Sequence, residues 1–414
     1  MNTISNILWL PLSIIILLTS IYFLFKLNFI TLKLHKIISS LNIKSFKETK
    51  SLLLTLSGKI GIGSISGIAI SILYGGPGTI FYIWIISFLT STLTYAETYL
   101  SMKYRIKDND LYKGGPSYYI KYGIKNNKLS KIYSLSILIC YIIGFISIQS
   151  NTVITLINDT LNINKTILVF FLCLILLLVL YRSTKKITDI SSKIVPFMLA
   201  LYIIITIYII ITNIKFIPHI LNEIIYYAFH DNNSIKGGLL FVIITGIKRN
   251  IFASETSVGT AGITSSSSSN KTPKQEGLLQ ILGVYIITML ICTCTSIIVL
   301  SSPYKLINAN DGIKLISHSL TYHLGSIGNI FLIISIFLFA FTTIITAYYY
   351  GEISLKALNK PNKINILKTL VIVICIISSY MNSNIIWQIT DILLSIICYI
   401  NIDSIIKLRK EIKC

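Results

Sequence analysis

Long apolar runs alternate with short polar gaps along the whole chain. An α-helix needs about 20 apolar residues to cross the hydrocarbon core of a bilayer. Eleven runs have or approach this length, and we predict a membrane-spanning helix for each of them: residues 7–25, 52–74, 79–103, 132–157, 166–181, 194–212, 237–265, 278–301, 327–350, 365–380 and 385–406. The pattern therefore predicts an all-α polytopic membrane protein with about 11 transmembrane helices.

The composition agrees with this pattern. Of the 414 residues, 54% are hydrophobic and only 12% are charged, and the mean hydropathy is +0.77. Soluble domains carry about 25% charged residues. No Lys or Arg precedes the first run and no small-residue cleavage site follows it, so we interpret this run as a retained span and not as a cleaved signal peptide.

Positive charge is distributed unevenly between the gaps. The net charge of +21 could indicate a nucleic-acid-binding protein, but Lys and Arg cluster in alternate gaps, with few aromatic residues arranged for base stacking. The basic gaps are 26–50, 103–131, 182–193, 271–274, 356–363 and 407–413. Because basic loops stay in the cytoplasm, we expect a bacterial inner (cell) membrane protein with its N-terminus outside, its C-terminus in the cytoplasm and no nucleic-acid partner.

The residues that carry chemistry argue against two other classes of function. Six of the seven cysteines lie within apolar runs, and the five histidines lie in loops or at span ends. No metal-binding spacing and no nucleophile with a base is present, so the sequence does not favour an intramembrane enzyme or a metal centre. A receptor that binds a ligand without moving it is a further alternative, although the short basic loops offer no output domain.

Two of the apolar runs are interrupted by glycine and polar residues. Residues 56–78 read LSGKIGIGSISGIAISILYGGPG, and residues 237–265 combine glycines with charged side chains. Each glycine weakens a helix by about 0.5–1 kcal/mol relative to alanine, and broken backbone at membrane depth must be covered by protein or line a cavity. Transporters bind substrates and ions at such breaks. Close helix packing is the alternative, and for Gly61 and Gly63 we favour the binding site.

The positions of the two interrupted runs suggest a domain organisation. If the first run is an accessory helix, the interrupted runs are the first and sixth of a ten-helix core, where a five-plus-five inverted repeat has its two broken helices. We therefore divide the chain into an accessory helix with a basic cytoplasmic loop (1–50), a first repeat (51–212), an external loop (213–236), and a second repeat with a short cytoplasmic tail (237–414).

Several motifs, taken together and in order, resemble the alanine or glycine:cation symporter family. The motifs are GIGSISG at 61–67 with GGPG at 75–78, GIKRNIF at 246–252, and FAFTT at 339–343. Further matching pieces extend the resemblance over nearly the whole chain. The resemblance implies the leucine-transporter fold and uptake of a small neutral amino acid, alanine or glycine, in symport with sodium. It implies no organic cofactor.

The resemblance also implies which residues form the two sites. Those expected to bind substrate are Ile62, Gly63, Ser64, Gln149, Phe252, Gly259 and Ala347. Those expected to bind sodium are the backbone carbonyls near Ser57 and Ile60 and the hydroxyls of Thr342 and Thr343. Free amides at a broken helix suit a substrate carboxylate, and oxygen ligands suit a hard cation. The alternatives are an interhelical hydrogen bond for Gln149, core packing for Phe252, and bonds from each threonine to its own helix.

Four acidic side chains lie within or beside the apolar runs: Glu97, Glu255, Glu352 and Asp391. Intramembrane acids are functional hypotheses by default. Glu97 and Glu352 lie beside basic gaps, so we expect structural pairing with the Lys and Arg residues there. Glu255 follows Lys248 and Arg249 in the sequence, and we expect it to form either a gate or a buried ion pair with them.

Some positions depart from the family's usual pattern: Ile62, Ser64, Ser254, Ile287 and Ala347. Ile62 and Ser64 remove polar groups from the first interrupted run, and Ile287 removes an intramembrane charge. These departures support an alternative function, in which the chain carries another small solute and uses protons or no coupling ion.

Overall fold

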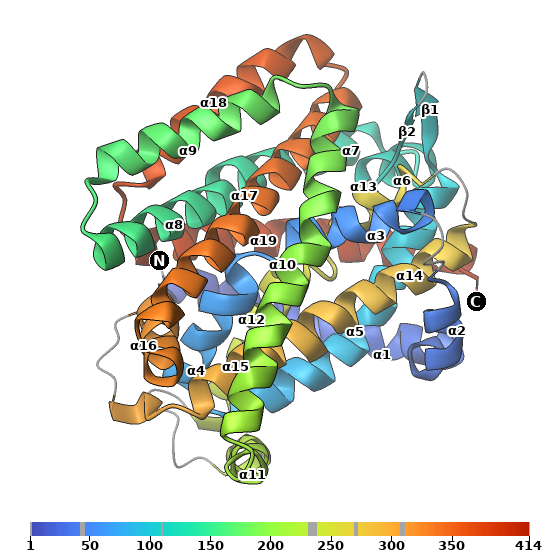
Figure 1. Ribbon diagram of the computed structural model, residues 1–414. Coiled ribbons are helices and arrows are strands. Elements are labelled where there is room, and N and C mark those ends of the chain that lie inside the picture. The colour runs from blue at the N-terminus through green and yellow to red at the C-terminus, as the bar shows by residue number, and fades with distance from the viewer. Residues whose placement is uncertain are drawn as a thin grey trace.

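The computed structural model describes residues 2–41, 46–108, 111–230, 238–268, 272–306 and 311–413, and helices make up most of it (Figure 1). Each predicted apolar run coincides with one long helix or with two shorter ones. These helices are α1 (Asn2–Lys26), α3 (Phe46–Lys59), α4 (Ile68–Gly75), α5 (Gly78–Lys103), α7 (Asn127–Ile139), α8 (Ile146–Leu161), α9 (Lys165–Leu180), α10 (Thr184–Thr212), α12 (Gly238–Ser254), α13 (Thr260–Ser265), α14 (Pro273–Tyr285), α15 (Cys292–Leu300), α17 (Ser326–Ala357), α18 (Ile364–Ser378) and α19 (Ser383–Lys407).

Short elements connect the long helices. The connecting helices are α2 (Leu34–Ser39), α6 (Pro116–Tyr122), α11 (Ile217–Phe229) and α16 (Gly312–Leu324). Strands β1 (Ile106–Asp108) and β2 (Leu111–Lys113) form an antiparallel hairpin in which Ile106 pairs with Lys113. In Figure 1, α11 and the hairpin lie at opposite ends of the molecule, and we call these the α11 end and the hairpin end.

If a span is defined only by the length and hydropathy of its helix, the structure has fewer spans than the eleven expected. Among the described residues, eight helices are long and apolar enough to cross a membrane, and the bent pair of α3 and α4 makes a ninth span. The remaining two expected spans are the 16-residue α9 and the interrupted pair of α12 and α13. Multiple membrane-length helices therefore establish a multi-pass membrane protein, whereas the count of eleven stays a prediction.

Two long helices, α5 and α17, position the interrupted helices between them. Helix α5 packs against α12, α13 and α14, while α17 packs against α3, α8 and α10. The accessory helix α1 lies against α5 and α19, and the Trp9 indole donates a hydrogen bond to the Asp391 carbonyl at 3.0 Å. Helices α9 and α18 lie side by side at the edge of the bundle (Figure 1).

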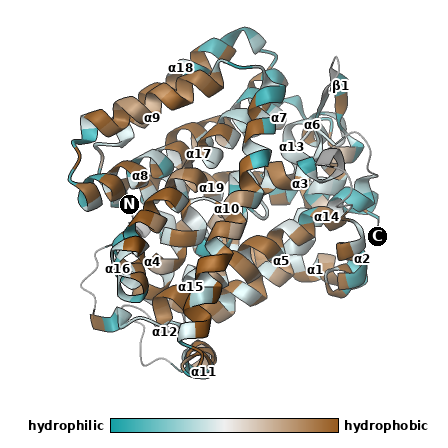
Figure 2. Cartoon of the chain, viewed as in Figure 1, coloured by the Kyte–Doolittle hydropathy of each residue, from teal (hydrophilic) through white to brown (hydrophobic). Residues whose placement is uncertain are grey.

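Apolar side chains cover the sides of this bundle. Figure 2 shows hydrophobic residues along the long helices and hydrophilic residues gathered mainly at the loops. Phe170 and Leu178 on α9 and Ile204 on α10 are each more than 60% exposed. Such exposure would be costly in water and is expected where a side chain faces lipid.

Three π-helical turns interrupt the regular helices near the centre of the fold. They comprise Gly63–Gly67, Cys140–Phe145 and Ile286–Ile291. The first and third contact each other and α12, and the second packs against α17 and α19. Such turns are frequent at functional sites because they re-aim side chains and free backbone groups. Their convergence marks the place where the candidate site is built.

Candidate functional site

The first interrupted helix breaks between Lys59 and Gly63. Helices α3 and α4 are inclined to each other by 60°. The Ile62 amide leaves the helical ladder and donates to Gln149 Oε1 at 3.2 Å. A Cβ on Gly61 would lie 2.7 Å from Thr343 Oγ1 and 3.0 Å from Gln149 Nε2. Glycine is therefore required at Gly61, because α8 and α17 bring polar side chains directly against the backbone.

The second interrupted helix breaks between α12 and α13. Within this break, Glu255, Ser257 and Gly259 have φ values of 49°, 69° and 100°. Residues other than glycine rarely adopt this left-handed region, so the break is a strained turn and not a simple fraying of the helix. Asn401 Nδ2 donates to the Ser257 carbonyl at 2.9 Å, and the Tyr133 hydroxyl donates to the Val258 carbonyl at 2.6 Å. Side chains from other helices thus satisfy the carbonyls that the break frees.

An aromatic stack joins the two breaks. The Phe252 ring lies parallel to Phe145 at a centroid distance of 4.7 Å and is tilted against Trp387 at the same distance. A Cβ on Gly63 would lie 2.5 Å from the Phe252 ring. The ring therefore rests on the bare backbone of the first break, which joins two of the predicted substrate residues. Trp387 was not singled out from the sequence, because no local pattern distinguishes it.

An ion-pair cluster lies on the α11 side of this stack. Arg249 Nη2 is 2.7 Å from Asp391 Oδ2, and Lys248 Nζ is 3.7 Å from the same oxygen. The Arg249 guanidinium also lies over the Trp387 ring, 4.8 Å from its centroid. The structure does not show the alternative in which Glu255 forms a buried ion pair with Lys248 and Arg249, and the other alternative, a gate, stays a prediction. Asp391 of α19 is the partner of both basic side chains, and we call this group the Asp391 cluster.

The other acids have different partners. Glu352 pairs with Lys356 one helical turn away and accepts a hydrogen bond from Thr184 at 2.7 Å, as a structural role predicts. Glu97, by contrast, accepts a hydrogen bond from Asn401 at 3.0 Å. Its electrostatic partner is Lys59 and not a lysine of the neighbouring basic gap. The sequence prediction for Glu97 is thus corrected.

Lys103 is not available to Glu97, because its ammonium pairs with Glu411 at 2.8 Å. Arg105 likewise donates to the Ser266 carbonyl at 3.2 Å and also to the Ser268 carbonyl. Both basic side chains therefore hold the hairpin end of the bundle together.

The predicted sodium ligands are only partly brought together. Thr343 Oγ1 donates to the Phe339 carbonyl of its own helix at 2.8 Å and lies 3.3 Å from the Ser57 carbonyl and 3.5 Å from the Ile60 carbonyl. The oxygens of Ser57, Ile60 and Thr343 come from α3, its break and α17, and hydroxyl and carbonyl oxygens are the ligands that a hard cation prefers. Thr342 is directed elsewhere, since its hydroxyl donates to the Leu338 carbonyl at 3.0 Å and faces α10. The expectation that Thr342 joins this group is not supported by the geometry.

Two hydroxyls that the sequence analysis missed lie beside the same group. Thr346 Oγ1 is 2.8 Å from Ser57 Oγ and 3.1 Å from Ser191 Oγ of α10. Thr346 lies three residues after Thr343, so its position on the face that meets α3 could have been inferred from helical spacing. Ser191 could not, because only the packed structure shows that α10 crosses there.

The remaining predicted substrate residues differ in position. The Ser64 hydroxyl bonds back to the Gly61 carbonyl at 2.9 Å and so stabilises the break. Gly259 lies in the second break, but a Cβ there would meet Pro116 and Tyr133 and not the first interrupted helix. Ala347 is buried on α17. Ile62 and Ser64 are fully buried, and Gln149 and Phe252 are nearly so.

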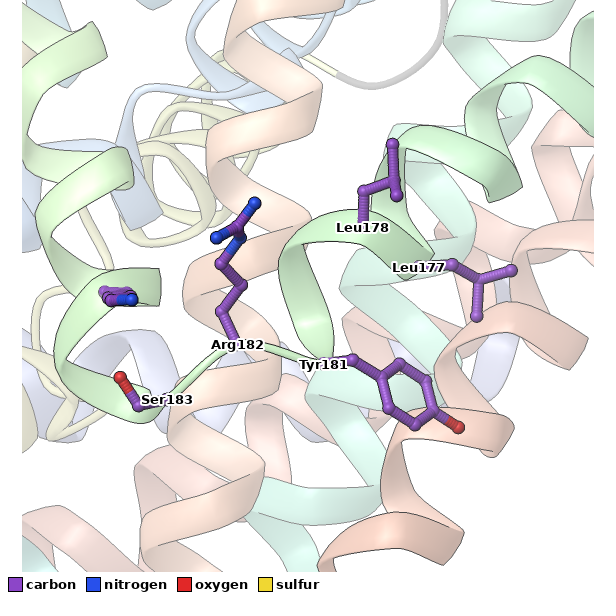
Figure 3. A pocket seen from close by; sticks show the side chains of 6 residues that line it. Leu177, Leu178, Tyr181, Arg182 and Ser183 are labelled. Carbon is purple, nitrogen blue, oxygen red and sulfur yellow. The ribbon is translucent and has the colours of Figure 1, made fainter.

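A surface cavity of about 650 Å³ lies at the turn between α9 and α10. It is lined by Leu177, Leu178, Tyr181, Arg182, Ser183 and Lys186 (Figure 3). Its lining includes none of the residues of the two breaks, the aromatic stack or the predicted sodium ligands. We therefore assign the candidate site to the buried convergence of the breaks and not to this cavity.

Comparison with known proteins establishes the family of this chain. The family model described as "Sodium:alanine symporter family" matches residues 1–413. The chain belongs to this family. Its members are transporters and not enzymes, and the resemblance predicted from the motifs is confirmed.

Individual relatives show how far the similarity extends. A probable sodium/glutamine symporter from Bacillus subtilis is 30% identical over 418 residues, covering 99% of this chain and 87% of the relative. A sodium/alanine symporter from Methanococcus maripaludis is 27% identical, covering 95% of this chain and 90% of the relative. A manganese transporter from Eremococcus coleocola shares the fold with a TM-score of 0.53 at 12% identity, over 85% of this chain and 75% of that one.

Two glycines of the first interrupted helix provide a matched test of the site. A Cβ at Gly63 would press on the Phe252 ring, whereas a Cβ at Gly67 would make an ordinary contact of 3.5 Å with Trp387. We expect Gly63→Ala to lower the affinity for the transported solute by about tenfold, equivalent to about 1.4 kcal/mol. Gly67→Ala should change it by less than about twofold. Concentration-dependent uptake in proteoliposomes measures both, and equal effects would contradict the proposed contact of Gly63 with the site.

The Asp391 cluster makes a prediction about stability. Asp391→Asn leaves Lys248 and Arg249 buried without a countercharge, and breaking a buried pair in this way costs about 3–5 kcal/mol. We expect a clearly lower thermal unfolding temperature in detergent. Asp403→Asn is the control, because Asp403 lies on the same helix with its side chain half exposed beside Lys407. Similar unfolding temperatures for the two variants would show that the pair contributes nothing beyond a surface contact.

Proposed function

We propose that the chain imports a small neutral amino acid, alanine or glycine, in symport with sodium. The observation that carries the proposal is the meeting of two broken helices, where the Phe252 ring rests on Gly63 and Gln149 holds the Ile62 amide. The sodium:alanine symporter family and the relative from Methanococcus maripaludis support alanine, whereas another relative is named for glutamine.

The proposed sodium site lies where α17 meets the first break. A cation between Thr343 Oγ1 and the carbonyls of Ser57 and Ile60 would join these elements. The amino acid would then bridge the first and second breaks, with its carboxylate on the amides of the first. Because both ligands favour the same closed arrangement, each raises the affinity for the other.

The proposed transport cycle is alternating access within a five-plus-five core of eleven spans. In this proposal the α11 end faces outside and the hairpin end faces the cytoplasm, as the basic gaps predict. Substrate would enter past the Asp391 cluster and leave past the charged residues on the hairpin side of the breaks. One group of helices would rock against the other around the fixed site.

A second candidate is transport of another small solute, coupled to protons or to no ion. Ile62 and Ile287 are fully buried beside the breaks, where the family usually has polar side chains. The Ser64 hydroxyl is already bonded within its own turn. These observations reduce the number of free polar groups for a zwitterion.

Uptake into proteoliposomes distinguishes the two candidates. Labelled alanine should accumulate under an inward sodium gradient, fail to accumulate when potassium replaces sodium, and leak out when a sodium ionophore is added. Uptake that ignores sodium would instead favour the second candidate. Absence of alanine and glycine uptake, with counterflow of a different solute, would overturn the substrate assignment.

Adjacent threonines provide the matched test of the sodium site. Thr343→Ala removes the oxygen that faces the Ser57 and Ile60 carbonyls, so we expect the sodium concentration for half-maximal uptake to rise about tenfold. At saturating sodium the affinity for alanine should change much less. Thr342→Ala removes a hydroxyl that bonds only within α17 or faces Met198, and we expect a change below about twofold. Equal loss at all sodium concentrations in Thr343→Ala would contradict the assignment.

A further inference from the structure

Three buried ionisable side chains from three separate elements lie within electrostatic range of one another on the hairpin side of the breaks. Lys59 ends α3, Glu97 lies on α5 six residues before its end, and Glu255 lies in the break after α12. The two carboxyls are fully buried and the lysine is 3% exposed. Asn401 Nδ2 donates both to Glu97 at 3.0 Å and to the Ser257 carbonyl, two residues after Glu255, at 2.9 Å, so the two acids belong to one buried region, and Lys59 lies within electrostatic range of both. We call these residues the Lys59 cluster.

Hydrogen bonds satisfy only part of the Lys59 cluster. One oxygen of Glu97 accepts from Asn401 at 3.0 Å, and one oxygen of Glu255 accepts from Thr260 at 2.6 Å. Within the described part of the chain, Lys59 Nζ has no hydrogen-bond partner, and the second oxygen of each carboxyl has only a loosely placed donor, the Gly259 amide beside Glu97 and the Tyr141 hydroxyl beside Glu255. Polar atoms this deeply buried are normally paired, so this cluster has capacity to bind something further.

Among the described residues, no second cation lies beside the Lys59 cluster. The titratable groups that face it from the neighbouring helices are uncharged in their ordinary states: Tyr119 on α6, Tyr133 on α7, Cys140 and Tyr141 at the second π turn, Tyr350 on α17 and Cys398 on α19. Two carboxylates and one ammonium give the cluster a net charge of −1. An uncompensated charge in a dry site costs several kcal/mol, which the fold must offset.

We propose that the Lys59 cluster binds one proton, on the carboxyl of Glu97 or of Glu255, while the hairpin side of the molecule is closed. A proton neutralises the excess charge of the cluster and adds an O–H donor to it. A metal ion fits less well, because the adjacent ammonium would repel it and the described residues contain no group of three metal-ligating side chains. Because the acids are coupled, the proton belongs to the pair and not to either residue alone.

This proton site has a consequence for transport, and this step rests on the proposed function. Opening the hairpin side would admit water to the Lys59 cluster and remove the need for the proton. Closing that side again would require its uptake from the cytoplasm. An acidic cytoplasm should therefore favour the closed state, and an alkaline cytoplasm the open one. Proton binding to the cluster would therefore shift the equilibrium between the closed and the open state, whether or not the proton crosses the membrane.

Infrared spectroscopy tests the proton directly and requires no knowledge of the substrate. At neutral pH the full-length protein in lipid should show the carbonyl stretch of a neutral, buried carboxyl. This band should vanish in both Glu97→Gln and Glu255→Gln, because the remaining carboxylate then balances Lys59. Asp403→Asn, a change at a half-exposed acid on α19, should keep the band. Absence of the band in the unaltered protein would overturn the proposal even if sodium-driven transport is observed.

Exchange in proteoliposomes tests the consequence. With the external pH fixed, exchange of labelled alanine should slow as the internal pH rises, by up to about tenfold per pH unit, as a one-proton equilibrium dictates. Glu97→Gln should be insensitive to internal pH, and Asp403→Asn should behave as the unaltered protein does. Glu255→Gln replaces Glu97→Gln if the latter fails to fold. Unchanged pH dependence in a folded Gln variant would contradict the link between the cluster and closure.

Discussion

The absence of water in the bilayer core is the constraint on which the rest of the structure depends. Every amide and carbonyl freed by a break must find a partner within the protein. Gln149 meets the Ile62 amide, and Asn401 and Tyr133 meet the carbonyls of Ser257 and Val258. Because these partners come from α7, α8 and α19, the surrounding helices have to be where they are before the breaks can exist. The broken helices of the site can therefore form only when the surrounding helices are packed around them.

Much of the fold follows from local properties of the sequence. Apolar length places the helices, and clustered glycines place the first break, because both are read within a single segment. The span count of eleven does not follow from length, since α9 is short and α12 is interrupted. The second break is also less visible, because two of its three left-handed residues, Glu255 and Ser257, are not glycine. Tertiary contacts, and not local preference, hold those residues in place.

The partners of charged side chains could not be predicted from nearness in sequence. Glu255 lies six residues after Arg249, which places the two on different faces of a helix. In the structure Arg249 pairs with Asp391, 142 residues away. Glu255 instead accepts a hydrogen bond from Thr260 and lies within electrostatic range of Lys59. Lys59 itself was detectable, because it is the only charge within the first interrupted run and an intramembrane charge is a functional hypothesis by default. Thr343 entered the predicted sodium site only through the family resemblance, and its role there stays a prediction.

The Asp391 cluster and the Lys59 cluster are held together by different kinds of interaction, as would suit the two opposite ends of the proposed transport pathway. The Asp391 cluster is a direct contact between α12 and α19, so separating these helices breaks it without any change of protonation. The Lys59 cluster has no such direct pairing and is held together by charge across α3, α5 and the second break. The first is therefore a mechanical contact between two helices. The Lys59 cluster, in contrast, responds to the proton concentration of the compartment to which it opens. In the proposed pathway, opening of one end would therefore depend on pH and opening of the other would not.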